Sequence, residues 1–155
     1  MNIGLVVYSQ TGHTLSVVMK LKEKLSAAGH AVTLEQLETA GAVGLGAASA
    51  ELKTRPAINV YDALVFCAPV QGGVPAAPMA SYLEQVASLE GKRVACLVTG
   101  FFPAAGWGRN QTIAQMKAVC EAKGATVCGA GSVGWFTLNR KSQISQVVDS
   151  LSALF

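Results

Sequence analysis

Residues 2–14 read NIGLVVYSQTGHT. The first seven, Asn2 to Tyr8, form a near-continuous apolar run, which is typical of a strand buried on both faces of a parallel sheet. From Thr14 to Ala28, apolar residues recur at helical spacing with lysines and a glutamate between them, and Gly29 stands where a helix would stop. This segment therefore predicts a strand, a polar loop and a helix in direct succession.

The same alternation continues to the carboxyl terminus. Strand patterns cover residues 31–37, 60–68, 93–99 and 126–133, and helical periods cover residues 79–89, 111–123 and about 144–154. The 31–37 segment alternates apolar and polar residues, as expected of an edge strand. Residues 38–59 are rich in glycine, and we expect a long connection there with one short helix over residues 47–53. The order predicts an α/β fold with a parallel sheet, in a single domain of residues 1–155.

The composition is unusually apolar for its size. Of the 155 residues, 51% are hydrophobic and 14% are charged, with a formal net charge of +3. The longest apolar runs are far shorter than the roughly 20 residues that a membrane-spanning helix needs, so we assign the apolar excess to a core. The amino terminus has no cationic segment ahead of an apolar one, which predicts a cytoplasmic protein without a membrane partner.

Other classes of site have little support. The two histidines lie far apart, and no Cys, Asp or Glu stands at ligand spacing from them, so we expect no metal. The four cysteines contain no Cys-x-x-Cys pair and are predicted to be reduced core thiols. The twelve basic residues are spread along the chain, which argues against a nucleic-acid partner.

In an open α/β sheet, ligands bind outside the carboxyl ends of the strands, near the point where the strand order reverses. The loops after Tyr8, Ala68 and Thr99 are therefore the candidate site. The first loop, residues 9–14, combines three hydroxyl side chains, a glycine and the free N–H groups of a helix amino terminus. It has no Lys or Arg and matches neither a Walker A loop nor a dinucleotide fingerprint, so we expect one phosphate monoester held by neutral donors. Alternatively, the hydroxyls only cap the helix.

The segment YSQTGHT resembles the phosphate loop of the flavodoxin family, in which a strand end is followed by Ser/Thr-x-Thr-Gly-x-Thr. The chain length, the succession of strands and helices and the position of the loop after the first strand agree as well, so the resemblance covers the whole chain. It implies a flavodoxin-like three-layer α/β/α sandwich with a five-stranded parallel sheet of order 2-1-3-4-5, and FMN as cofactor. It also implies side-chain hydrogen bonds to the FMN phosphate from Ser9, Thr11 and Thr14, and backbone N–H groups of Gln10, Gly12 and His13 around it.

The second loop is similar to the family's loop beside the isoalloxazine ring. It begins Pro69-Val70-Gln71-Gly72-Gly73, and Gln71 stands where many relatives carry an aromatic residue. The two glycines would let the backbone approach the flavin and change conformation beside it. The alternative is that the glycines and prolines simply form a tight turn between a strand and a helix.

The third loop, residues 99–110, contains three aromatic residues among glycines. Thr99 and Gly100 would lie at the ring, with Phe101 in contact with the pocket and Trp107 at its rim. Alternatively, Phe101 and Phe102 fold into the core. We expect Arg109 to face solvent rather than a substrate phosphate. No residue is assigned a catalytic role: a proton-transfer role for His13 is the weaker interpretation, because no carboxylate neighbours it in sequence to orient it.

The resemblance implies electron carriage between partner proteins through non-covalent FMN. Without cationic neighbours, a buried flavin would disfavour its anionic reduced form, which lowers the reduction potential. Carriers of this family tend to be acidic, whereas this chain has a formal charge of +3. An FMN-dependent NAD(P)H:quinone-type oxidoreductase, acting on a small-molecule electron acceptor and often a homo-oligomer, is therefore the alternative. A flavodoxin-like binding domain that has lost the flavin is a further one.

Overall fold

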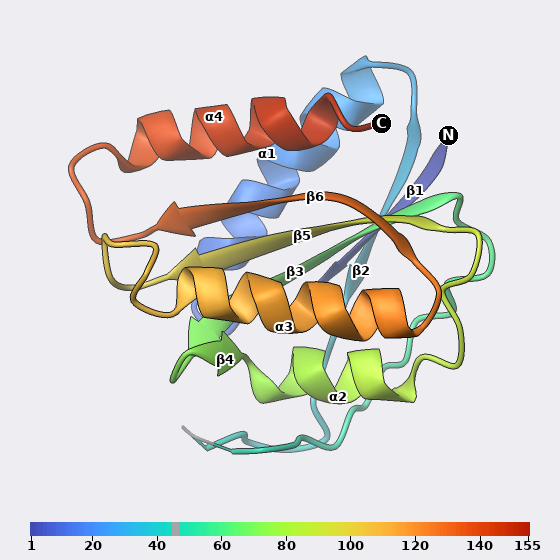
Figure 1. The fold of residues 1–155 in the computed structure, drawn as a ribbon, viewed down its shortest axis with the longest axis horizontal. Coiled ribbons are helices and arrows are strands. Elements are labelled where there is room, and N and C mark those ends of the chain that lie inside the picture. Colours follow the sequence, from blue (N-terminus) through green and yellow to red (C-terminus); the bar gives the residue numbers. More distant parts are fainter. Residues whose placement is uncertain (45–46) are drawn as a thin grey trace.

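A central parallel sheet organises the chain in the computed structural model, which describes residues 1–44 and 47–155 (Figure 1). Its strands follow the order β2-β1-β3-β5-β6, with the short β4 paired antiparallel to β3. Since β4 is a hairpin strand, the five parallel strands keep the predicted order 2-1-3-4-5. The strands are β1 (Asn2–Val7), β2 (Ala31–Gln36), β3 (Ala63–Gln71), β4 (Val74–Pro75), β5 (Arg93–Gly100) and β6 (Thr126–Gly134).

Helices cover both faces of the sheet, which confirms the three-layer α/β/α prediction. Helices α1 (His13–Ala27) and α4 (Arg140–Ser152) pack on one face, and α2 (Ala77–Gln85) and α3 (Arg109–Ala122) pack on the other (Figure 1). The first face buries aliphatic side chains such as Val18 and Leu21 of α1 against Leu5 of β1. The second buries Met79 and Met116 against Phe66 of β3. The apolar excess of the composition is this double core.

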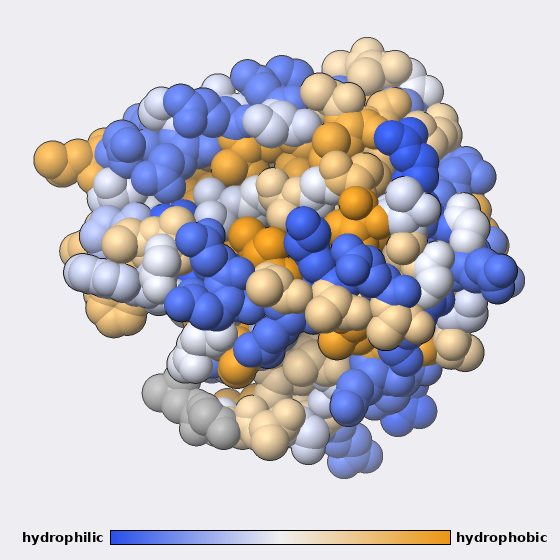
Figure 2. All heavy atoms as spheres, in the orientation of Figure 1, coloured by the Kyte–Doolittle hydropathy of each residue, from blue (hydrophilic) through white to orange (hydrophobic). Residues whose placement is uncertain are grey.

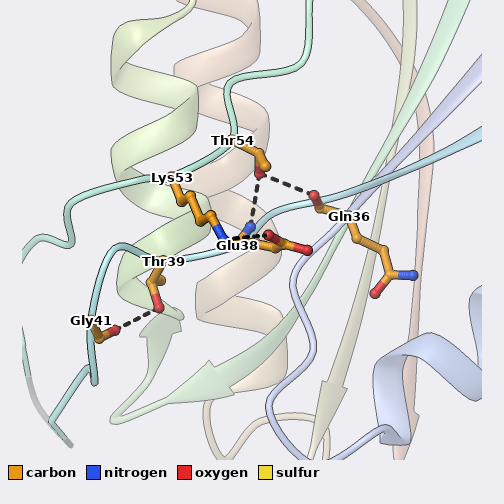
Figure 3. A network of polar contacts seen from close by, with 6 residues as sticks. All are labelled: Gln36, Glu38, Thr39, Gly41, Lys53 and Thr54. Atoms are coloured by element: carbon orange, nitrogen blue, oxygen red, sulfur yellow. Dashed lines mark hydrogen bonds and ion pairs between the residues drawn. The ribbon is translucent and has the colours of Figure 1, made fainter.

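The connection between β2 and β3 contains no helix in its described residues, so the short helix expected over residues 47–53 is wrong. The chain instead folds back on itself, and Thr39 forms an isolated antiparallel bridge with Leu52. Thr54 fixes the return: its hydroxyl donates to the Gln36 carbonyl oxygen at 3.1 Å and accepts from the Glu38 N–H at 2.9 Å (Figure 3). Because polar side chains of the loop satisfy its backbone groups, no helical turn is needed.

Two further boundaries differ from the prediction. The helix expected over residues 79–89 is α2, which ends at Gln85 because Val86 is extended. Val86 and Leu89 are still buried, which is why the apolar period continued past the helix end. The strand expected over residues 60–68 is β3, which begins at Ala63 and continues to Gln71, where it turns into β4.

Two other features bear on function. Within the described residues, no helix is long and apolar enough to cross a membrane, and no group of three metal-ligating side chains occurs. All four cysteines are free thiols, three of them buried, as predicted. Burial raises the pKa of the Cys67 thiol, which marks it as a core group rather than a nucleophile.

Candidate functional site at the carboxyl edge of the sheet

The three predicted loops meet at the carboxyl ends of β1, β3 and β5, where they enclose a cavity of about 210 Å³, here called the main cavity. A fourth loop, residues 135–139 between β6 and α4, contributes Trp135 to its lining. The lining residues are Gln10, Thr11, His13, Pro69, Val70, Gln71, Thr99, Gly100, Phe101 and Trp135. Nine of these ten residues are sequence-predicted site residues, and Trp135 is the exception. Of the other predicted residues, Ser9, Gly12 and Thr14 lie in or beside the first loop without lining the cavity.

Two of the three hydroxyls in the first loop are engaged within the protein. The N–H groups of Gly12 and Leu15 donate to Ser9 Oγ at 3.1 and 3.3 Å, so Ser9 holds the loop against the start of α1. Thr14 is buried, and its Oγ1 lies 2.7 Å from Thr99 Oγ1 at the end of β5. Each arrangement still leaves one hydroxyl hydrogen free to donate, because Ser9 only accepts and the threonine pair uses one of its two hydrogens. Capping and anion binding are therefore compatible here.

The same loop leaves backbone donors unused. The N–H groups of Gln10, Thr11, His13 and Thr14 have no acceptor among the residues that the structure describes. The Thr11 side chain is exposed and has no hydrogen-bond partner in residues 1–44 and 47–155. Gly12 makes the bend possible with φ at +87°, a backbone conformation that other residues adopt only with strain. Unpaired N–H groups at a helix amino terminus attract an anion.

The second loop is a tight hairpin rather than a turn into a helix. Gly72 and Gly73, at φ +62° and +80°, connect β3 to β4 as the two central residues of a two-residue hairpin turn. Gln71, at the end of β3, donates from Nε2 to Gln10 Oε1 at 3.1 Å. This hydrogen bond joins the first and second loops across one side of the main cavity. The Gln71 side chain thus connects two loops.

The third loop exposes its aromatic rings, so the alternative that Phe101 and Phe102 fold into the core is wrong. Phe101 and Trp107 are 62% and 64% exposed. Phe101 stacks on Phe136 of the fourth loop with ring centroids 4.9 Å apart, and Phe102 contacts Trp107 edge to face at 5.8 Å. These four rings, here called the aromatic cluster, project at the same edge of the sheet as the main cavity. Hydrophobic atoms also protrude where the β6–α4 loop lies, at the left in Figure 2.

Sequence reasoning missed Trp135, which lies at the carboxyl end of β6. The His13 imidazole stacks on its indole ring, and the guanidinium carbon of Arg140 lies 4.6 Å from the centroid of the same ring. The predicted site comprises only the loops after Tyr8, Ala68 and Thr99, and the loop after β6 is not among them. The signal that could have found it is the pair Trp135-Phe136 directly after a strand, since that places aromatic residues at the same edge as the other loops.

Arg109 is buried, so the expectation that it faces solvent is wrong. It is 5% exposed and lines a second cavity of about 110 Å³, here called the side cavity. Its Nη2 donates to the Pro103 carbonyl oxygen at 2.8 Å and its Nη1 to Ser132 Oγ at 3.2 Å. The side cavity adjoins the main one, because both share Val70, Gly100 and Phe101. Its other lining residues are Gly72, Gly73, Phe102 and Trp107.

The charge around both cavities has one sign. The loop segments 9–13, 69–76, 100–108 and 134–139 contain no Asp or Glu, and the charged residues that follow the last two are Arg109 and Arg140. Burial lowers the pKa of Arg109, yet a guanidinium keeps its proton in proteins. The site therefore has a positive potential that favours anionic ligands.

A larger cavity, of about 560 Å³, lies at the opposite edge of the sheet, between residues 55–59 and 85–88. Those segments precede β3 and β5, so they lie at the amino ends of the strands. Ligands of open α/β folds bind at the carboxyl ends. The larger volume of this cavity therefore does not make it the candidate site.

The strand order and the covering of both sheet faces define a flavodoxin-like α/β fold. Flavodoxin 2 from Bacillus cereus matches it with a TM-score of 0.69 at 19% identity, over 100% of both chains. A flavodoxin from Streptococcus pneumoniae TIGR4 matches with 0.69 at 16% identity, also over 100% of both chains. A flavodoxin, WrbA-like protein from Agrobacterium tumefaciens matches with 0.69 at 14% identity over 99% of each chain. No protein-family model and no curated protein sequence matches this chain.

Proposed function

We propose that this chain is a redox protein that binds FMN non-covalently and exchanges electrons with a partner protein or a small-molecule acceptor. The observation that carries the proposal is the set of unpaired donors in the first loop. Four backbone N–H groups and the Thr11 hydroxyl lie at the amino terminus of α1, next to the main cavity. This set of neutral donors fits one phosphate monoester. The loop lacks the G-x-G-x-x-G pattern of a dinucleotide pyrophosphate site.

The residues of the other loops fit the ring end of the cofactor. Pro69, Val70, Thr99, Gly100 and Phe101 line the main cavity with mostly apolar surface. Since the main cavity holds about 210 Å³, a flavin would fill it and extend over its rim. When bound, FMN supplies the electron-accepting ring, while the protein supplies binding, orientation and electrostatics.

The experiment compares FMN with riboflavin, which lacks the phosphate. In Thr11→Ala we expect FMN to bind about tenfold more weakly, because a hydrogen bond to a charged group contributes roughly 1.5–3 kcal/mol. Riboflavin affinity should not change. Thr126→Ala is the matched control, since Thr126 is also exposed but begins β6 at the opposite edge of the sheet.

Fluorescence titration of the purified protein measures both affinities. Equal loss of both ligands in Thr11→Ala would contradict the phosphate assignment. Failure of the unaltered protein to quench FMN at micromolar concentration would contradict flavin binding altogether and would favour a flavodoxin-like binding domain without flavin.

A second candidate, an FMN-dependent NAD(P)H:quinone-type oxidoreductase, is favoured by the charge of the site. Acidic residues are absent from the sequence of the four loops, whereas a carrier that docks on basic partners needs them. The aromatic cluster also offers a surface for a planar acceptor. Direct oxidation of NADH or NADPH with a quinone would favour the enzyme, and reduction in two resolved one-electron steps would favour the carrier.

A further inference from the structure

Arg109 occupies a position built to bury a guanidinium. It is the first residue of α3, and its aliphatic stem lies against Gly100 at the end of β5. A Cβ at Gly100 would come within 2.8 Å of Arg109 Cγ, and one at Gly134 within 3.1 Å of Arg109 Nη2. The absence of side chains at both strand ends therefore makes room for the arginine.

The buried charge has no anionic partner. Among the described residues the ion pairs are Lys24 with Asp149 and Lys53 with Glu38, both at the surface. The Arg109 guanidinium donates to one neutral hydroxyl and to one carbonyl oxygen. Its Nε has no hydrogen-bond partner among the residues that the structure describes. Burial of a guanidinium without a carboxylate partner is costly, so an anion nearby would stabilise Arg109.

The main cavity is the place where such an anion would bind. Gly100 lines the main cavity and the Arg109 stem packs against it, and Arg109 itself lines the side cavity that adjoins the main one. A charge needs no contact to act there, since electrostatic energies stay appreciable over several ångströms at protein-like dielectric constants. The oxidised ring of a flavin is neutral, but the two-electron-reduced ring readily loses its N1 proton and becomes an anion.

We propose that Arg109 is the positive charge that holds reduced flavin in its anionic form, so that this site binds reduced FMN more tightly than oxidised FMN and accepts electrons in pairs. This inference rests on the proposed function. When bound, FMN would supply the two-electron chemistry, with a reduced nicotinamide as a donor that becomes oxidised. Arg109 would supply the positive charge beside the cavity that favours the anionic reduced ring over the neutral one. This proposal is the opposite of the sequence-based expectation, which is a site without cationic neighbours and a lowered reduction potential.

The test measures the ratio of the dissociation constants of oxidised and reduced FMN, by anaerobic titration and by the two-electron potential of the bound flavin. In the unaltered protein reduced FMN should bind at least tenfold more tightly. Arg109→Gln, which keeps hydrogen-bond donors but loses the charge, should lower that ratio at least tenfold, equivalent to about 30 mV for a two-electron couple. Arg109→Lys should keep most of it.

Arg93→Gln is the matched control, because it removes the same charge from the amino end of β5, the strand whose carboxyl end contacts Arg109. Arg93 lies seven residues from Gly100, about 23 Å along β5. In Arg93→Gln the ratio of the dissociation constants of oxidised and reduced FMN should be unchanged. Equal weakening of both redox forms in Arg109→Gln would show that Arg109 only holds the loop through Pro103, and an unchanged ratio would show that its charge is irrelevant. Either result overturns the inference.

A measurement on the unaltered protein covers the case in which Arg109→Gln does not fold. The absorbance spectrum of bound reduced FMN should stay that of the anion at a pH at least one unit below that at which free reduced FMN takes up its N1 proton. Protonation at the same pH as free flavin would overturn the inference while leaving FMN binding intact. Absence of any FMN binding would instead contradict the proposed function itself and, with it, this inference.

Discussion

The His13 imidazole lies parallel to the Trp135 indole, with ring centroids 4.1 Å apart and an interplanar angle of 13°. His13 is the first residue of α1 and Trp135 follows β6, so this stack joins the phosphate-suited loop to the loop that sequence reasoning missed. Both side chains line the main cavity. The fourth loop is therefore part of the candidate site and not a remote edge of the sheet.

The placement of Trp135 predicts which tryptophan senses the flavin. In Trp107→Phe, where Trp135 is the remaining tryptophan, saturating FMN should quench more than half of the emission. In Trp135→Phe the quenching of Trp107 should be clearly weaker, because Trp107 lines the side cavity and is 64% exposed. Steady-state fluorescence measures both. Equal quenching in the two variants would place the flavin elsewhere.

Phe101 and Phe102 offer a matched pair for testing the ring contact. They are 62% and 52% exposed, but Phe101 lines both cavities whereas Phe102 lines only the side cavity. Phe101→Ala should weaken FMN and riboflavin alike, by about three- to tenfold, since an aromatic contact contributes roughly 0.5–1.5 kcal/mol. Phe102→Ala should have a smaller effect on both ligands. The reverse order of the two effects in a binding titration would contradict the assignment of Phe101.

The hydrogen bond between Thr14 and Thr99 predicts an effect on stability. Thr14→Val leaves the Thr99 hydroxyl buried without a partner, which should lower the free energy of unfolding by about 1–3 kcal/mol. The double variant Thr14→Val/Thr99→Val should recover part of that loss, because it leaves no unpaired hydroxyl. Urea unfolding measures the unaltered protein, the single variants Thr14→Val and Thr99→Val, and the double variant. Strict additivity of the two single changes would show that the hydroxyls do not interact.

The sequence predicts the fold well because the buried strands have a recognisable apolar pattern. Strands β1, β3 and β5 have both faces covered, so their segments are continuous apolar runs that no other element explains. The β2–β3 connection could not be predicted in the same way. Its Thr39–Leu52 bridge joins residues that local composition does not link, and the apparent helical pattern over residues 47–53 is only weakly apolar.

The site was predicted in its loops but not in its charges. A local motif identifies the Ser9–Thr14 loop, because its donors are contiguous in sequence. Arg109 is different, since its burial depends on Gly100 and Gly134, two glycines on neighbouring strands that become adjacent only when β5 pairs with β6. The stack of His13 on Trp135 likewise joins residues 122 positions apart. Such pairings require the tertiary structure.

The buried thiol and phenol groups predict that stability falls in alkaline solution. Burial raises the pKa of the Cys67 thiol above its ordinary value of 9.0 and that of Tyr82 from 10.0 to about 12, with the Glu35 charge adding to the effect on Tyr82. Below pH 9 both groups are protonated in the folded and the unfolded chain, so neither affects the pH dependence. As the pH rises, the unfolded chain loses these protons first and is favoured, because the folded chain still holds them.

We therefore expect the free energy of unfolding to decline from about pH 9 and to keep declining until about pH 12, where folded Tyr82 ionises. Tyr82→Phe should flatten the decline between pH 10 and 12, and Cys67→Ala should flatten it near pH 9, although each variant loses some stability at neutral pH. Urea unfolding at pH 7.5, 9.5 and 11 measures the slopes. A Tyr82→Phe slope equal to that of the unaltered protein between pH 9.5 and 11 would mean that Tyr82 titrates alike in the folded and unfolded chain, contrary to its burial in the α2 face of the core.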